Sequence, residues 1–171
     1  MNRSRIVIFV EGADDERFFE KIIKPKLEPR IVEIRSYAHL NNSKMKRYVR
    51  SIKQIGAEFY FSADLDEMPC ISSKKNLIFK KYPFIDRKCI LIVKKEIESW
   101  YLAGLTDRRS KGFGIKPMEN TECIGKEEFN RKILRKNQTR LTSMKEILDG
   151  YSYSEAMKRN ASFRYVMQRL D

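Results

Sequence analysis

The fold is decided by residues 5–16, which read RIVIFVEGADDE. Residues 5–10 are apolar and β-branched almost without interruption, which is typical of a parallel strand buried on both faces. Glu11-Gly12 ends this strand, and a helix is expected from about Asp14. Its inward-facing stripe consists of Phe18, Phe19, Ile22 and Ile23. A buried strand followed at once by an amphipathic helix predicts an α/β fold.

The same alternation continues along the chain. Further strands are expected at 31–35, 57–63 and 88–93. A helix is expected from Ser43, as its N-cap, to Gly56, and another in the seventies. The apolar positions of the first of these helices, which we expect to face inward, are Met45, Tyr48, Val49, Ile52 and Ile55. Strands that alternate with helices predict right-handed βαβ units and a mainly parallel sheet flanked by helices.

Beyond Gly104 the pattern changes. Residues 105–125 carry glycines and prolines and are expected to form a loop. Helices are expected at 126–136, at 143–149 and at 153–169. The last two follow the capping-box patterns Ser143-x-x-Glu146 and Ser152-x-x-Glu155. We therefore expect a single domain in which a core of residues 1–104 carries a helical C-terminal extension of residues 105–171.

The composition limits the classes of function. The chain has 171 residues and a net charge of +13, which favours a polyanionic partner, although a lysine-rich solvated surface would give the same charge. No apolar run approaches the roughly 18 residues of a membrane span, so we expect no membrane partner. Three isolated cysteines fit a reducing cytoplasm. His39 is the only histidine, which excludes metal sites built on two histidines.

The acidic residues of the expected core are segregated. Of the 14 acids in residues 1–104, ten fall in three short stretches, and the intervening stretches are basic. The three stretches hold Glu11, Asp14, Asp15 and Glu16; Glu58, Asp64, Asp66 and Glu67; and Glu96 and Glu98. Residues 20–53, in contrast, hold ten Lys and Arg against three acids. This separation of charge points to an acidic site within a basic surround.

The acidic stretches follow expected strands. Glu11 and the Asp64/Asp66 pair each come at the carboxyl end of a strand, and Glu96 and Glu98 follow a third. In an open α/β sheet these ends share one edge, where ligands bind. Carboxylates gathered there would repel one another unless a cation neutralised them, and oxygen-only ligands suit Mg²⁺ or Mn²⁺. Acids after strands are also common helix caps, and Asp14, Asp15 and Glu16 suit a helix N-terminus in any case.

The pattern Val10-Glu11-Gly12-x-Asp14, followed by Asp64-x-Asp66, resembles the Toprim domain of topoisomerases, bacterial primases and OLD-type nucleases. The resemblance covers residues 5–104 and implies that Glu11 is a general acid or base and that Asp64 and Asp66 bind the metal. The segment 96–103 is similar to small stand-alone Toprim-like proteins of unassigned function. Related OLD-type domains carry further acids, to which Glu98 or Glu96 would correspond. A zinc ribbon and strand-passage domains are absent from the sequence.

The basic surface offers two candidates for binding phosphates. One is the helix that carries Lys44, Lys46, Arg47 and Arg50; the other is the C-terminal set Arg131, Lys132, Arg135, Lys136 and Arg140. Either set could equally be a solvated face. Trp100 lies in an apolar run and is expected in the core. The sequence thus predicts a Mg²⁺- or Mn²⁺-dependent nuclease acting on DNA or RNA. A non-catalytic Toprim-like binding module, or a subunit of a defence or repair assembly with a protein partner, is the alternative.

Overall fold

A computed structural model describes residues 4–171. The chain divides into two compact units, the first ending at Ile92 and the second running from Val93 to Asp171. The boundary expected at residue 104 falls inside the second unit, because the helix that follows residue 97 packs on later helices. Among residues 4–171, no helix is long and apolar enough to cross a membrane.

The first unit alternates strands with helices. Its elements are β1 (Arg5–Val10), α1 (Ala13–Phe18), a π-helical turn (Phe19–Ile23), a 3₁₀ turn (Lys24–Leu27), β2 (Ile31–Ser36), α2 (Asn42–Gln54), β3 (Glu58–Asp64), α3 (Ile71–Lys81), a 3₁₀ turn (Arg87–Cys89) and β4 (Ile90–Val93). The strands form one sheet in the order β2-β1-β3-β4. Strand β1 runs parallel to both of its neighbours, with Phe9 level with Arg35 and with Phe61. The expected α/β fold with a mainly parallel sheet is confirmed.

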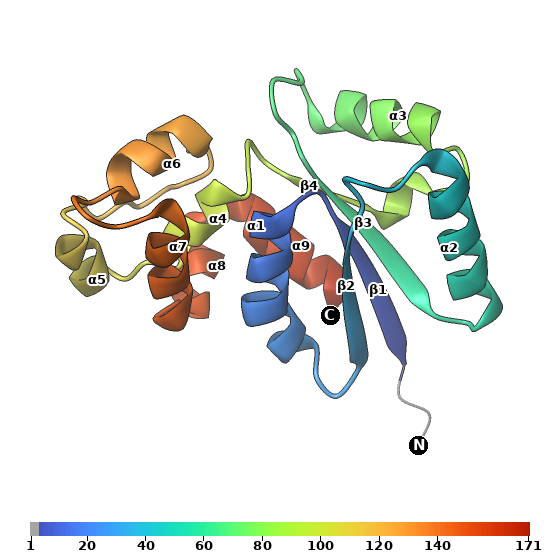
Figure 1. Ribbon diagram of the computed structural model, residues 1–171, viewed down its shortest axis with the longest axis horizontal. Coiled ribbons are helices and arrows are strands. Elements are labelled where there is room, and N and C mark those ends of the chain that lie inside the picture. The colour runs from blue at the N-terminus through green and yellow to red at the C-terminus, as the bar shows by residue number, and fades with distance from the viewer. Residues whose placement is uncertain (1–3) are drawn as a thin grey trace. The chain divides into compact units, whose positions relative to one another are not determined.

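Helices cover both faces of this sheet. Figure 1 shows α1 on one side and α2 and α3 on the other. Because strand side chains alternate between faces, Val7 and Phe9 point toward α2 and α3. They join a buried cluster with Met45, Val49, Ile52, Phe59, Phe61, Ala63, Ile78, Tyr82, Ile85, Ile90 and Ile92. The expected stripe of α1 and the turn after it is also buried.

Helix α2 differs from expectation at its start and along its stripe. Asn41, not Ser43, is the N-cap, because the Asn41 side chain accepts a hydrogen bond from the backbone N–H of Lys44. Met45, Val49 and Ile52 are buried as expected, whereas Tyr48 and Ile55 are 42% and 61% exposed. The stripe that reaches the core is therefore narrower than the apolar pattern suggested.

The second unit is helical. Its elements are α4 (Glu98–Ala103), α5 (Asp107–Gly112), α6 (Lys126–Ile133), α7 (Arg140–Asp149), α8 (Tyr153–Arg159) and α9 (Ala161–Leu170). Helix α4 contacts α6, α7 and α8. Trp100 is fully buried, as expected, and its indole N–H donates to the Ser162 hydroxyl at 2.9 Å. Gly104 leaves no room for a Cβ because the Tyr151 ring lies against it.

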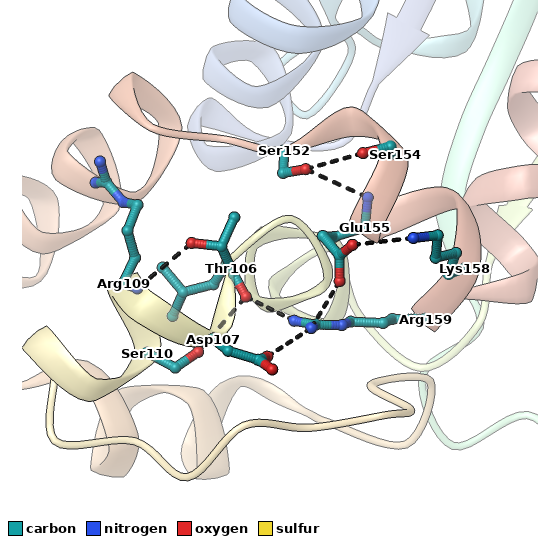
Figure 2. A network of polar contacts seen from close by, with 10 residues as sticks. Thr106, Asp107, Arg109, Ser110, Ser152, Ser154, Glu155, Lys158 and Arg159 are labelled. Atoms are coloured by element: carbon teal, nitrogen blue, oxygen red, sulfur yellow. Dashed lines mark hydrogen bonds and ion pairs between the residues drawn. The ribbon is translucent and has the colours of Figure 1, made fainter.

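A polar network joins α5 to α8 (Figure 2). The Arg159 guanidinium donates to the Leu105 carbonyl oxygen and to Asp107, each at 2.7 Å, and pairs with Glu155 at 2.7 Å. Ser152 caps α8 by accepting from the Glu155 N–H at 3.3 Å, as its sequence pattern predicted. The arginine at the end of α8 thus fixes the chain where α5 begins.

Three expectations for this unit are wrong. The stretch 105–125 contains α5, which Thr106 caps through the Arg109 N–H. Ser143 does not cap a helix: α7 starts earlier, behind Thr139, and the buried Ser143 hydroxyl donates to the Ile133 carbonyl. The helix expected at 153–169 is interrupted at Asn160, whose extended backbone separates α8 from α9. In each case a side-chain hydrogen bond to the backbone lies where the expectation fails.

Asn160 should be the most costly helix cap to remove in the second unit. Its side chain is fully buried, caps α9 through the Phe163 N–H, and also contacts Thr121 and Ser162. Asn160→Ala removes the cap and leaves buried partners unsatisfied, so we expect a loss of about 2–4 kcal/mol in unfolding free energy. Thr139→Ala removes only an exposed cap and should cost about 1 kcal/mol. Equal losses in denaturant unfolding would contradict the role of the buried network.

Candidate active site at the strand ends

The parallel pairing of β1 with β3 brings the first two acidic stretches to one edge. Glu11 follows the last residue of β1, and Asp64 is the last residue of β3. The two strands are adjacent and in register, with Phe9 beside Phe61. Glu11 is therefore close to level with Asp64 at the carboxyl ends. Asp66 follows in a left-handed backbone conformation, with φ of 52°.

Tyr37, which follows β2, holds Glu11 in place. Its hydroxyl donates a hydrogen bond to the Glu11 carboxylate at 2.8 Å and lies 3.4 Å from the Ser62 carbonyl oxygen. The tyrosine ring stacks on Phe61 with centroids 4.1 Å apart. Its backbone N–H donates to the Val10 carbonyl at 2.9 Å. The Glu11 carboxylate is thus oriented by a tyrosine whose ring packs on β3 and whose backbone is bonded to β1.

The site raises the pKa of Glu11. Burial of the carboxyl is the main cause, and the negative charge of Asp66 acts in the same direction. The Tyr37 hydrogen bond and the positive charges of Lys74 and Lys81 oppose the rise. A carboxylate with a raised pKa holds a proton more readily than a free one, which suits a general base.

Lys74 of α3 extends into the acidic site. Its ammonium forms an ion pair with Asp66 at 2.6 Å, although the lysine is only 8% exposed. A buried lysine needs such a partner because desolvation disfavours its charged form. Lys74 therefore supplies a positive charge that pairs with Asp66 and also acts on Glu11.

Two buried carboxylates lie near Tyr37. Asp15 and Asp64 are 5% and 9% exposed, and their charges help to raise the pKa of the Tyr37 phenol, after burial and Glu11. Asp15 also accepts from the Gly12 N–H at 3.3 Å, so its expected role at the helix N-terminus is observed. Glu11 thus contacts the Tyr37 hydroxyl, and the charges of Asp15 and Asp64 act on the same group.

The donor atoms suit a hard cation, but they are not gathered as a complete cage. Glu11, Asp64 and Asp66 offer only carboxylate oxygens, the ligands of Mg²⁺ and Mn²⁺. Within residues 4–171, however, no three His, Cys, Asp or Glu side chains are grouped so as to hold an ion. The Lys74 ammonium balances Asp66 instead. An ion bound here would take over that role of the ammonium.

Glu96 and Glu98 have partners within the second unit. The Glu96 carboxylate accepts from the Lys126 N–H at the start of α6. Glu98 is 3% exposed and pairs with the Arg140 guanidinium at 2.6 Å. Both contacts stabilise the packing of this unit. That Glu96 or Glu98 binds a metal ion together with Glu11 stays a prediction.

The two basic candidates differ in how their charges are used. Lys44, Lys46, Arg47 and Arg50 are exposed on α2, and none of the four forms an ion pair in the part of the chain that the structure describes. In the C-terminal set, Lys132 pairs with Glu128, Arg135 with Glu146, and Arg140 with Glu98. Arg131 and Lys136 of that set are exposed and also form no ion pair among the described residues. Helix α2 is therefore the candidate of which all four cations remain available.

Sequence reasoning missed Tyr37 and Lys74 as site residues. A tyrosine directly after an expected strand that neighbours the glutamate-bearing strand was the available signal for Tyr37. Lys74 lies eight residues after Asp66, and nothing in the sequence distinguishes it from the adjacent Lys75. Only the helical phase of α3 turns Lys74 inward.

Comparison of the chain with protein-family models, with curated proteins and with solved structures gives no match. The Toprim resemblance therefore stands on the residues that carry it, Glu11, Asp64 and Asp66.

Neutralising Glu11 should stabilise the protein at neutral pH. A carboxyl whose pKa is raised in the folded state costs stability once it ionises, and this cost disappears as pH falls below its ordinary value of 4.5. Glu11→Gln should therefore melt above the wild type near neutral pH, and the difference should shrink in acid. Thermal unfolding across this pH range measures it. The exposed Glu119, changed to Gln, should leave the melting temperature unaltered; an equal shift there would refute the explanation.

Proposed function

We propose that the protein catalyses divalent-metal-dependent phosphoryl transfer on nucleic acid, as a nuclease of Toprim type. The observation that carries the proposal is the Glu11 carboxylate, with its raised pKa, held by Tyr37 at the same strand edge as Asp64 and Asp66. The motif resemblance supports the same assignment.

In this proposal each residue has a separate task. Glu11 takes a proton from the attacking water as the water oxygen bonds to phosphorus. The bond between phosphorus and the leaving oxygen breaks, and the leaving oxygen takes a proton from solvent. Tyr37 keeps the Glu11 carboxylate oriented through its 2.8 Å hydrogen bond. Asp64 and Asp66 would hold Mg²⁺ or Mn²⁺, with Glu98 or Glu96 as a further predicted ligand. The ion supplies Lewis-acid stabilisation of the phosphoryl charge.

In this proposal Lys74, which pairs with Asp66 in this structure, also binds the substrate. An ion held by Asp66 would replace the Lys74 ammonium as its counter-charge and would free the ammonium from its 2.6 Å contact. Within the site, a phosphate oxygen is the natural next partner for a buried ammonium. Lys74 would then help to hold the substrate next to Glu11.

Nucleic acid is the proposed substrate because α2 carries cations without acidic partners. Lys44, Lys46, Arg47 and Arg50 can each neutralise a phosphate. Helix α2 follows Tyr37 after a short turn, so its first residues lie at the strand edge that carries Glu11. A cytoplasmic location fits such a substrate and is part of the proposal.

Cleavage is the direct test. Wild-type protein incubated with mixed single-stranded and duplex DNA and RNA should degrade at least one of them with Mn²⁺ and none with a chelator. Asp64→Asn with Asp66→Asn should abolish cleavage because the ion loses its ligands, a loss on the order of a hundredfold or more. Gel electrophoresis of labelled strands measures it.

Glu119→Gln, an exposed acid outside the site, is the control and should cleave at the wild-type rate. Cleavage that survives the double asparagine variant would refute the assigned site. Binding of nucleic acid without cleavage under any divalent ion would instead support the non-catalytic binding module. The neutralisation of Asp66 by Lys74 is the observation that favours this alternative.

The salt dependence of binding should locate the phosphate-binding surface. Each cation that contacts a phosphate releases a counterion, so replacing Lys46, Arg47 and Arg50 by Ala should flatten the log–log salt slope by about two units or more. A charge-matched triple, Lys116→Ala, Arg131→Ala and Lys136→Ala, should leave the slope close to that of the wild type. Fluorescence anisotropy in chelator gives both slopes. The reverse ranking would assign phosphate binding to the second unit.

A further inference from the structure

Helix α2 lines a hollow whose chemistry goes beyond phosphate binding. The hollow has a volume of about 510 Å³ and is lined by Leu40, Lys44, Arg47, Tyr48 and Ser51. The four helical residues recur at spacings of three and four, so they lie on one face of α2. Leu40 packs against the buried core cluster and anchors the hollow to the sheet.

Tyr48 is an aromatic residue of α2 that does not pack in the core. It is 42% exposed, although its apolar neighbours Met45 and Val49 on the same helix are buried. Along α2 it comes directly after Arg47 and one turn after Lys44, and neither cation has an ion-pair partner among the described residues. An exposed aromatic ring beside two available cations is the combination that binds a stacked base together with its phosphates.

The hollow begins close to the candidate active site. The Leu40 N–H donates to the Tyr37 carbonyl at 2.9 Å, which closes a turn between the two residues. Such a turn keeps their Cα atoms within about 7 Å. Tyr37 holds Glu11, and Leu40 lines the hollow, so a strand lying in the hollow would lead toward Glu11.

We propose that this hollow binds single-stranded nucleic acid, with a base stacked on Tyr48 and the flanking phosphates on Lys44 and Arg47. The proposal deepens the proposed function and rests on nucleic acid being its substrate. A duplex does not fit the assignment, because its bases are already stacked and their faces are closed to a tyrosine. Stacking on a ring is tolerant of sequence, so little base preference is expected.

The test compares an intact single strand with one whose bases have been removed. Binding of a short labelled oligothymidylate and of an abasic strand of equal length is measured by fluorescence anisotropy in chelator, where no cleavage occurs. Tyr48→Ala should weaken binding of the intact strand about fivefold or more and leave binding of the abasic strand unchanged. Tyr48→Phe keeps the ring and should bind as the wild type does.

Tyr165→Ala provides the matched control, because Tyr165 is also an exposed tyrosine, 49% accessible, on α9. It should bind both strands as the wild type does. The proposal is overturned if Tyr48→Ala binds the intact strand normally, if the wild type binds the abasic strand equally well, or if a duplex of equal length binds more tightly. Displacement of the strand by polyglutamate at equal charge would assign the hollow to an acidic polypeptide and would also overturn it.

The outcomes separate this inference from the nuclease proposal. A base-dependent loss in Tyr48→Ala without cleavage by the wild type would support the hollow and reject the enzymatic role. Cleavage by the wild type with unchanged binding by Tyr48→Ala would support the nuclease proposal and reject the binding of a base at the hollow. Circular dichroism of each variant confirms that the fold is retained.

Discussion

The double pairing of β1 is the constraint on which the first unit depends. Because β1 lies between β2 and β3 and is parallel to both, three strand ends meet at one edge. Each end then contributes a different group: Glu11 from β1, Tyr37 from β2 and Asp64 from β3. Backbone hydrogen bonds fix the strand register, so the spacing of these groups does not depend on loop conformation. The Tyr37–Glu11 contact is a direct result of this register.

Charge balance is the second determinant of the site. The negative charges of Glu11, Asp15 and Asp64 act on the same hydroxyl, and without positive charge nearby the repulsion among the three would oppose folding. Lys74 supplies that charge from α3 and Lys81 adds to it. The acidic edge can therefore form before any ion binds. In the second unit the same principle appears in the pair of the buried Glu98 with the partly exposed Arg140, which joins α4 to α7.

The parts that could be predicted from the sequence are those set by periodicity. The four strands and the exit of Glu11 and Asp64 at strand ends follow from apolar runs of strand length. Periodicity does not predict the helix limits at Ser143 and Asn160. The Ser143 hydroxyl points inward to the Ile133 carbonyl and does not cap a helix, and the buried Asn160 amide begins a new helix. Lys74 could not be predicted either, since its burial depends on the phase of α3 against the sheet. Tyr48 was expected inward because the period identifies apolar residues and not the width of the face that the core covers.

Helix α2 contains no acidic residue, and this has a consequence for its own stability. Its cations follow one another at spacings of three and four residues, as in Lys44–Arg47 and Lys46–Arg50. Each such like-charge pair costs roughly 0.2–0.5 kcal/mol in water. The helix is held against this self-repulsion by the Asn41 cap and by the burial of its apolar stripe. Dissolved salt therefore stabilises the helix by screening the repulsion between its cations. A bound polyanion would relieve the same repulsion by neutralising these cations.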